Sequence, residues 1–565
     1  MTVIGSLPPF AIFFAGALVV GFLRGWLRSV AILLIPVIGA LNILAMPDDA
    51  AWQVPLFDYV LTVFQVDRLS LLFGYLFHIA AFLGFLFALH VRDPLQQIAA
   101  ILYAGGALGA VFAGDMIVLF VFWEVLALSS VGLIWATRTE RAYAAGMRYL
   151  LIQILSGVML MAGIILRAQD VGSIAIEPLK LDGIASWLIF LAFGIKCAFP
   201  MLHNWLTDAY PESTPTGTVF LSAFTTKVAV YALARTFAGT ELLVFVGATM
   251  AMFPIFFAVI ENDLRRVLAY SLINQVGFMV VGIGLGTELA LNGAIAHAFN
   301  DVVFKGLLFM SMGAVLFRTG KINGSDLGGL YKSMPWTTGF CIVGAASISA
   351  FPLFSGFVSK SMVMVAALDQ GYPLVWLALL FASAGVFHHA GIKIPFFAFF
   401  AHDSGIRTRE APWNMLLAMG IAAALCIFNG SYPWVLYSIL PFPVTYDPFD
   451  ATHVLAQLQL LFFSALAFCW LKLAGIYPPE LRSVNIDVEV TYRKWLPALS
   501  RSVRKAAEAA SAAVAAVGGS CLNLLLERVL HYHGPRGILA RTWAVGGAAI
   551  WVMALLGIYM LLYFV

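Results

Sequence analysis

Charged residues are scarce in this chain, and their scarcity excludes a soluble fold. Asp, Glu, Lys and Arg make up 11% of the 565 residues, hydrophobic residues make up 62%, and the mean hydropathy is +0.94. Soluble domains carry about 25% charged residues. Apolar runs of about 17–25 residues, long enough to cross about 30 Å of hydrocarbon, recur along nearly the whole length. The sequence therefore predicts an all-α polytopic membrane protein with about 14–16 transmembrane helices.

Cysteine is also rare, and its spacing argues against redox sites. The five cysteines are scattered in apolar surroundings and form neither a CxxC nor a CxxCH motif. This pattern indicates no disulfide framework, iron–sulfur site or haem, and we predict no cofactor, no metal site and no catalytic residue. The net charge of +3 is too small to indicate a nucleic-acid partner. Because no basic region or cleavage site precedes the first apolar run, we expect a retained span there.

The apolar runs and the residues that break them predict six regions. They are N-terminal transmembrane helices over 1–95, a first five-helix repeat over 96–236, a linking helix with a second, inverted five-helix repeat over 243–400, additional transmembrane helices over 413–475, an amphipathic lateral helix on the cytoplasmic face over 480–540, and a C-terminal transmembrane helix over 541–565. The lateral helix is expected because 491–533 is basic early and rich in Ala and Leu later.

Loop charge orients the chain in the lipid bilayer. If the run 336–369 crosses once, as a discontinuous helix, the basic loops share one side and the acidic loops share the other. This is the positive-inside pattern, and it predicts that both termini lie outside the cytoplasm. The expected location is a bacterial-type plasma (inner) membrane. The basic residues are Arg24, Arg28, Arg138, Arg141, Arg148, Arg265, Arg266, Arg318, Lys321, Lys332, Arg407 and Arg409, and the acidic residues are Asp48, Asp49, Glu177, Asp182, Asp447 and Asp450.

Two predicted helices, 185–203 and 336–369, are interrupted by proline and carry lysine. Lys196 and Lys360, one in each helix, are 164 positions apart. The spans that follow add a second pair 166 positions apart, Lys227 and Lys393. Repeats with an odd number of spans are inverted relative to each other, and broken helices at matched positions indicate an ion path.

Ionisable side chains inside the predicted spans form the candidate site. Such residues are costly in hydrocarbon and usually mark proton relays or counter-ion pairs. Lysine suits a relay because burial and neighbouring cations make its proton easier to release. His297, Asp301 and Lys305 are spaced i, i+4 and i+8, so they line one helix face. The predicted proton-transfer residues are Glu124, Lys196, Lys227, His297, Asp301, Lys305, Lys360 and Lys393, to which a less general pattern adds His388 and His389.

Five segments in order resemble one family, the antiporter-like subunits of respiratory complex I and of Mrp-type cation/proton antiporters. The resemblance runs from about 68 to 400. It implies a proton path through two inverted five-helix units. The segments are "FWEVLALSS", "GIKCAFPMLHNWLTDAYPESTPTGTVFLSAFTTKVAVYAL", "DLRRVLAYSLINQVGFM", "HAFNDVVFKGLLFMSMG" and "FPLFSGFVSK".

The resemblance also implies roles for single residues. Glu124 matches the family's glutamate and Lys196 its broken-helix lysine, and the two would form a switching ion pair. Asp301 departs from the pattern, since many members have histidine there, and two roles stay open: a proton carrier, or a counter-ion that holds Lys305 charged. The remaining matches are Lys227 with the lysine of the next helix, His297 and Lys305 with the central-helix pair, and Lys360 with the exit lysine.

Three functions remain open for the chain. "NIDVEVTYRK" resembles the tail of long Mrp subunit-D-like proteins, so the leading prediction is a proton-translocating integral membrane subunit of a multi-subunit cation/proton antiporter. The alternatives are a proton-pumping subunit of a redox complex (NADH:quinone oxidoreductase or membrane hydrogenase) and the membrane subunit of a two-component inorganic-carbon pump. Each implies other membrane subunits as partners and protons as the transported ion, with sodium left open. The sequence does not choose the driving force.

Overall fold

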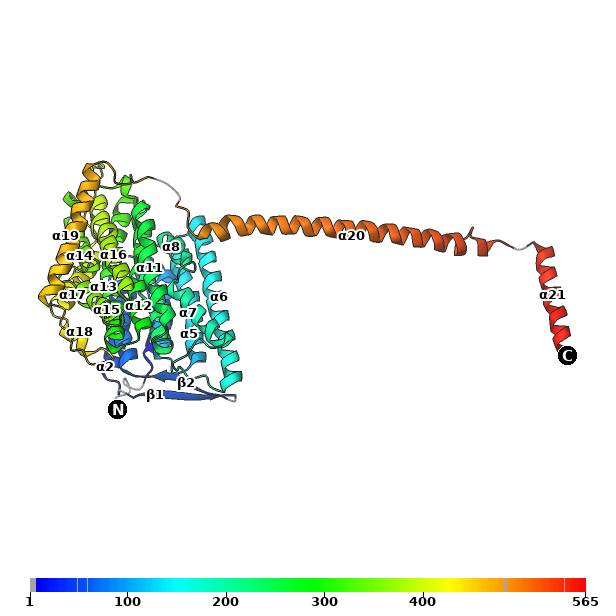
Figure 1. Ribbon diagram of the computed structural model, residues 1–565, viewed down its shortest axis with the longest axis horizontal. Helices are drawn as coiled ribbons and strands as arrows, with labels where there is room; N and C mark the ends of the chain where they lie inside the picture. Colours follow the sequence, from blue (N-terminus) through cyan, green and yellow to red (C-terminus); the bar gives the residue numbers. More distant parts are fainter. Residues whose placement is uncertain (1–6, 48, 58, 482–484, 543, 565) are drawn as a thin grey trace. The chain divides into compact units, whose positions relative to one another are not determined.

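The computed structural model describes residues 7–47, 49–57, 59–481, 485–542 and 544–564. Contacts divide the chain into two compact units, Met1–Asn485 and Ile486–Val565. In the first unit the helices pack side by side as a bundle, and a β-hairpin lies across one end of it (Figure 1). The core sits along α12 (Leu264–Leu285), in which all but one residue is buried, and along the middle of α13 (Glu288–Thr319).

The N-terminal region contains the one departure from an all-α fold in the described residues. Helices α1 (Pro9–Phe22) and α2 (Gly25–Leu44) come first, and strands β1 (Ala51–Leu56) and β2 (Tyr59–Gln65), which pair antiparallel, lie between α2 and α3 (Arg68–Phe87) in the sequence. The prediction of a purely helical chain missed this hairpin. The buried Asp115 side chain holds the hairpin against the bundle, because it accepts a hydrogen bond from Thr62 N at 2.6 Å. The same side chain accepts from Val118 N at 2.8 Å and so caps the helix that begins at Met116.

The first set of five spans begins with α4 (Pro94–Phe112), α5 (Met116–Trp135) and α6 (Glu140–Val171). The fourth span is interrupted, with α7 (Ile184–Cys197) followed by α8 (Asn204–Ala209) and η2 (Tyr210–Glu212). The fifth consists of α9 (Gly217–Ala223) and α10 (Thr225–Thr236).

The second set has the same order when α11 (Glu241–Ile260) is counted as its first span. Helices α12 and α13 follow, and the interrupted fourth span is α14 (Pro335–Ile348) with α15 (Ser355–Asp369). The fifth is α16 (Pro373–Val386), continued by the π-helices η5 (Phe387–Lys393) and η6 (Phe396–Phe400). Two 3-10 turns, η3 (Gly324–Asp326) and η4 (Leu330–Lys332), precede α14. Because five is odd, we expect the two sets to run in opposite directions; in this count α11, the predicted linking helix, serves as the first span of the second set.

Helices α14 and α15 together make one crossing. At the start of α14, Thr337 Oγ1 donates to Glu410 Oε1 at 2.6 Å, and Arg318 Nε near the C-terminal end of α13 donates to Glu410 O at 2.9 Å. Just beyond α15, Gln370 Nε2 donates at 2.9 Å to Thr287 Oγ1, which caps the opposite end of α13. The α14–α15 pair therefore traverses the length of α13, as the charge pattern predicts.

The two helix breaks share one backbone geometry. Ala198 and Met201 have φ of 63° and 67°, and Ala350 and Leu353, each 152 positions later, have φ of 57° and 72°. The break hydrogen bonds repeat with the same offset: Phe199 N donates to the Gly194 carbonyl at 3.0 Å, as Phe351 N does to the Ala346 carbonyl at 3.0 Å. Left-handed backbone costs about 1–2 kcal/mol per non-glycine residue, so each break is held by the surrounding structure.

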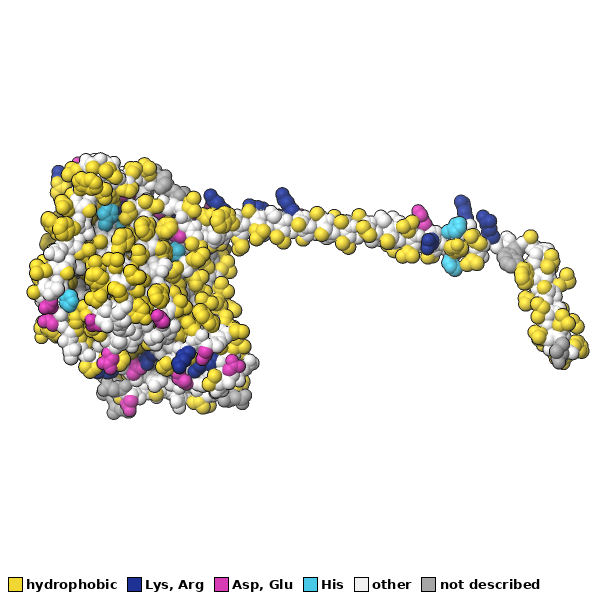
Figure 2. All heavy atoms as spheres, in the orientation of Figure 1, with side chains coloured by type: hydrophobic (Ala, Val, Ile, Leu, Met, Phe, Trp, Pro, Cys, Tyr) yellow, Lys and Arg dark blue, Asp and Glu magenta, His cyan; other side chains and the backbone are white. Residues whose placement is uncertain are grey.

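The rest of the first unit contains α17 (Trp413–Ser431), α18 (Trp434–Ser438) and α19 (Ala451–Leu473). The second unit contains η7 (Thr491–Trp495), α20 (Leu496–His533), η8 (Ile538–Ala540) and α21 (Val545–Tyr563). Among the described residues, 14 helices are long and apolar enough to cross a membrane. On the face of the first unit seen in Figure 2, hydrophobic side chains cover the length of the helices. The protein is a multi-pass membrane protein, and the lateral placement of α20 stays a prediction.

Candidate functional site

The centre of the site is one face of α13. His297, Asp301 and Lys305 are spaced by four residues, about one helical turn each, and all three are fully buried. Lys305 Nζ donates to Ser271 Oγ of α12 at 2.8 Å. The sequence predicts this stripe of ionisable groups, and the structure buries it between α12 and α13.

An ion pair joins the two five-helix sets at this stripe. Lys227 Nζ lies 2.6 Å from Asp301 Oδ2, and both side chains are fully buried. Lys227 stands in the first turn of α10, directly after the interruption between α9 and α10, and its Nζ also donates to the Ser222 carbonyl at 3.1 Å. Charges buried this deeply are tolerated only when they are paired and hydrogen-bonded. The ion-pair partner of Asp301 is thus a lysine of the other set, and not Lys305 on its own helix.

Lys196 and Glu124 are both neighbours of Trp123, Lys196 in space and Glu124 in the sequence. Lys196, in the last turn of α7, donates from Nζ to the Trp123 carbonyl at 2.5 Å, and its Nζ lies 4.5 Å from the centroid of that indole ring. Glu124 follows Trp123 on α5, and within the described chain its buried Oε1 accepts no hydrogen bond. A Cβ atom added at Gly157 of α6 would overlap this carboxylate. The structure brings the predicted pair together around one residue, without an ion pair between them.

His297 connects α13 to the second helix break. Its Nδ1 lies 3.0 Å from Ser359 Oγ, and its Nε2 lies 3.1 Å from Gln275 Oε1 of α12. Because the Gln275 oxygen can only accept, the ring is assigned with its proton on Nε2. Next to Ser359, Lys360 donates from Nζ to the Ile348 carbonyl at 2.7 Å. Ile348 is the last residue of α14, so Lys360 is bound by a carbonyl that its own break leaves free.

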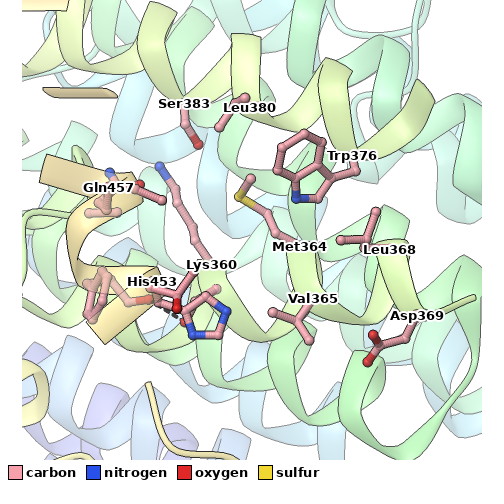
Figure 3. A pocket seen from close by; sticks show the side chains of 15 residues that line it. Lys360, Met364, Val365, Leu368, Asp369, Trp376, Leu380, Ser383, His453 and Gln457 are labelled. Atoms are coloured by element: carbon pink, nitrogen blue, oxygen red, sulfur yellow. Dashed lines mark hydrogen bonds between the residues drawn. The ribbon is translucent and has the colours of Figure 1, made fainter. Parts of the chain in front are cut away.

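A cavity of about 390 Å³ borders Lys360. It lies between α15, α16 and α19, and the Lys360 side chain extends within it towards Ser383 and Gln457 (Figure 3). Its other polar lining includes His453 of α19 and Asp369 at the end of α15. The cavity therefore extends from the second break along α15 towards the acidic end of the bundle, which is the end where the acidic loops lie.

The predicted residues of the fifth span lie apart from this series. Lys393 Nζ donates to the carbonyls of Val259 at 2.7 Å and Glu261 at 2.6 Å, at the C-terminal end of α11. It also forms an ion pair of 3.0 Å with Glu480 Oε1. His389 is fully buried. His388 makes ring contacts with Phe468 and Tyr477 at centroid distances of 5.5 and 5.4 Å.

Sequence reasoning missed the polar residues that hold the predicted ones. Ser271, Gln275 and Ser359 each contact an ionisable side chain of α13, and Glu480 pairs with Lys393. Ser271 and Gln275 lie four positions apart within "DLRRVLAYSLINQVGFM". This spacing puts them one turn apart on α12, and it could have identified them from the sequence. Glu480 stands in a loop outside every apolar run, where no pattern singles it out. Within the described residues, no group of three or more His, Cys, Asp or Glu could hold a metal ion.

The fold and the line of buried lysines define a class of membrane protein, the antiporter-like subunits. Residues 113–388 match the family described as NADH:quinone oxidoreductase/Mrp antiporter, transmembrane region. Among curated relatives, the A subunit of the Na(+)/H(+) antiporter from Alkalihalophilus pseudofirmus is 31% identical over 444 residues, which are 68% of this chain. The chain spans only 54% of that relative's length.

Two solved structures share the fold. One is a chain of the Mrp complex from Dietzia sp. DQ12-45-1b, with a TM-score of 0.69 and 22% identity over 78% of this chain and 96% of that one. The other belongs to the membrane-bound sulfane sulfur reductase, an archaeal respiratory membrane complex, with a TM-score of 0.71 and 20% identity over 98% of this chain and 99% of that one. The likeness extends the resemblance beyond residue 400 to the C-terminal helices.

Proposed function

We propose that the chain is a proton-translocating membrane subunit of a multi-subunit cation/proton antiporter. The observation that carries this proposal is the fully buried pair of Lys227 and Asp301, which bridges the two inverted sets. A buried ion pair adds little stability over a well-packed apolar pair, whereas intramembrane ionisable groups commonly serve proton transfer. The likeness to the Na(+)/H(+) antiporter of Alkalihalophilus pseudofirmus supports the same proposal.

In this proposal the proton path follows the buried groups from one set to the other. It runs from Glu124 and Lys196 to Lys227, across Asp301 to Lys305 and His297, and on to Lys360. The cavity beside Lys360 supplies room for water between that lysine and the acidic end of the bundle. The Lys196 side chain controls proton transfer in this proposal, because its movement between the Trp123 carbonyl and Glu124 would change its affinity for the proton. Protons are the proposed ion, and a sodium counter-ion would be handled elsewhere in the complex.

A second candidate is a subunit of a respiratory membrane complex. The observation that favours it is the agreement in length with the sulfane sulfur reductase chain, which includes α20 and α21. In either case we propose a bacterial-type inner membrane and other membrane subunits as partners. An inorganic-carbon pump stays open as a third assignment, and the driving force distinguishes the three.

The experiment is proton transport by the complete complex in membrane vesicles. Lys196→Ala and Glu124→Ala should each abolish coupled proton movement while the complex still assembles. A matched control is Lys332→Ala, a lysine outside the membrane-spanning helices, in η4, which should retain full transport. Transport near the wild-type rate in either Lys196→Ala or Glu124→Ala would overturn the proposed path. Driving transport by a sodium gradient, and then by electron donors, separates the first candidate from the second.

A further inference from the structure

Lys393 is held in place by backbone, independently of any acid. Its ammonium group has three protons, and three carbonyls at the end of α11 surround it: Ala258 at 3.4 Å, Val259 at 2.7 Å and Glu261 at 2.6 Å. The C-terminal end of a helix is its negative end and favours a cation. These carbonyls satisfy the ammonium group, so Lys393 can remain charged when Glu480 does not.

Glu480 is the less constrained member of the pair. Its side chain is 6% exposed, and apart from Lys393 no group in the described chain donates a hydrogen bond to either carboxylate oxygen. Structural carboxylates at such depth normally accept several hydrogen bonds. Burial raises the pKa of Glu480 above its ordinary value, although Lys393 and Lys472 act against that shift. The charged or titratable groups that face Glu480 are Lys393, Lys472, Glu261 and Tyr477.

Glu480 lies at the basic end of the bundle, which is the end where the basic loops lie. The carbonyls that hold Lys393 belong to the end of α11, where Glu261 lies 4.0 Å from Arg266. Tyr477, three residues before Glu480, packs its ring on His388 at a centroid distance of 5.4 Å. Beyond it, the fully buried His389 lies within electrostatic reach of Lys305. His388, His389 and Lys393 belong to η5, and π-helical turns inside helices frequently occur at functional sites.

We propose that Glu480 is a proton-binding residue of the transport path: its carboxylate takes up a proton at the basic end of the bundle while Lys393 stays charged as a fixed counter-charge. This inference rests on the proposed function. The proton adds to one carboxylate oxygen, and that O–H bond breaks again when the carboxylate releases the proton. Lys393 is then a positioning residue, and the loop after α19 is part of the transport machinery.

The test compares two acid–base pairs in the complete complex in vesicles. Glu480→Gln keeps the shape of the side chain and an oxygen that can accept from Lys393, but it cannot titrate. We expect at least a tenfold loss of proton transport, with unchanged assembly and unchanged thermal unfolding temperature. The matched control is Asp403→Asn, because Asp403 forms an exposed pair of 2.8 Å with Arg407. It should transport like the wild type.

A purely structural role for Glu480 predicts a different result. Glu480→Gln would then transport within twofold of the wild type with the same pH profile, and the proposal would be overturned. If Glu480→Gln does not assemble, Glu480→Asp decides. Its carboxylate is one methylene further from Lys393, so a slower rate with a shifted pH profile supports proton binding, and an unchanged rate and profile contradict it. Lys196→Ala is measured in parallel: normal transport there rejects the proposed function itself, whereas its inactivity beside a fully active Glu480→Gln rejects only this inference.

Discussion

At the first helix break the lysine stands four residues before the proline, on α7, and at the second it stands eight residues after the proline, on α15. The backbone of the two breaks nevertheless repeats with an offset of 152 residues, in its left-handed positions and in its hydrogen bonds. The interval of 164 between Lys196 and Lys360 is therefore not the period of the fold. The repeat preserves the break, and each set places its lysine differently around it.

The two lysines also differ in what binds them. Lys360 is held by the Ile348 carbonyl, which its own break leaves free, whereas Lys196 is held by the Trp123 carbonyl of a neighbouring helix. At the first break the Ile195 carbonyl, which corresponds to that of Ser347 at the second, accepts a hydrogen bond from Trp205 Nε1 at 2.8 Å. The two breaks thus share their backbone geometry, but their lysines are bound by carbonyls at different positions.

The largest expected effect concerns the ion pair that joins the sets. Lys227→Met leaves Asp301 as an unpaired charge at full burial, and breaking such a pair costs about 3–5 kcal/mol. Thermal unfolding of the purified complex should show this loss, and the double variant Lys227→Met/Asp301→Leu should recover most of it. The exposed pair supplies the control, because Arg407→Met should leave the unfolding temperature unchanged. Additive losses in the double variant would show that the two residues do not stabilise each other.

A smaller effect is expected where Glu124 meets α6. Gly157→Ala would push the Glu124 carboxylate out of its place, and overpacking of this kind costs about 1–3 kcal/mol. We expect a lower transport rate together with lower stability. Gly339→Ala on α14 is the matched control, because nothing lies within 4 Å of a Cβ there. Equal behaviour of the two variants in transport would mean that the position of Glu124 is not critical.

The smallest expected effect tests the shared backbone of the breaks. Ala198→Gly and Ala350→Gly each remove a side chain from a left-handed position, which relieves about 1–2 kcal/mol of strain and adds up to about 1 kcal/mol of unfolded-state entropy. Both should therefore leave thermal stability equal or slightly higher, and by the same amount. A marked loss at only one of them would contradict the equivalence of the two breaks.

Local patterns predicted the spans, the single crossing of α14–α15 and the burial of the α13 stripe, because each depends on periodicity, proline or charge along the chain. The hairpin was missed because its strands are short and mostly exposed, and they lie between strong helical signals. The partner of Asp301 could not be predicted, since Lys227 is 74 positions away and reaches it only through the kink between α9 and α10. The proton-transfer roles of these residues stay predictions.

The most direct test of the proton path is transport by Asp301 variants, measured as proton movement into vesicles that contain the complete complex. Asp301→Asn keeps the shape of the side chain but can neither titrate nor balance Lys227, and the account predicts loss of transport with assembly retained. Asp301→Glu keeps the carboxylate and should retain a substantial part of the rate. Transport by Asp301→Asn at the wild-type rate would contradict a path that crosses between the two helix sets at this pair.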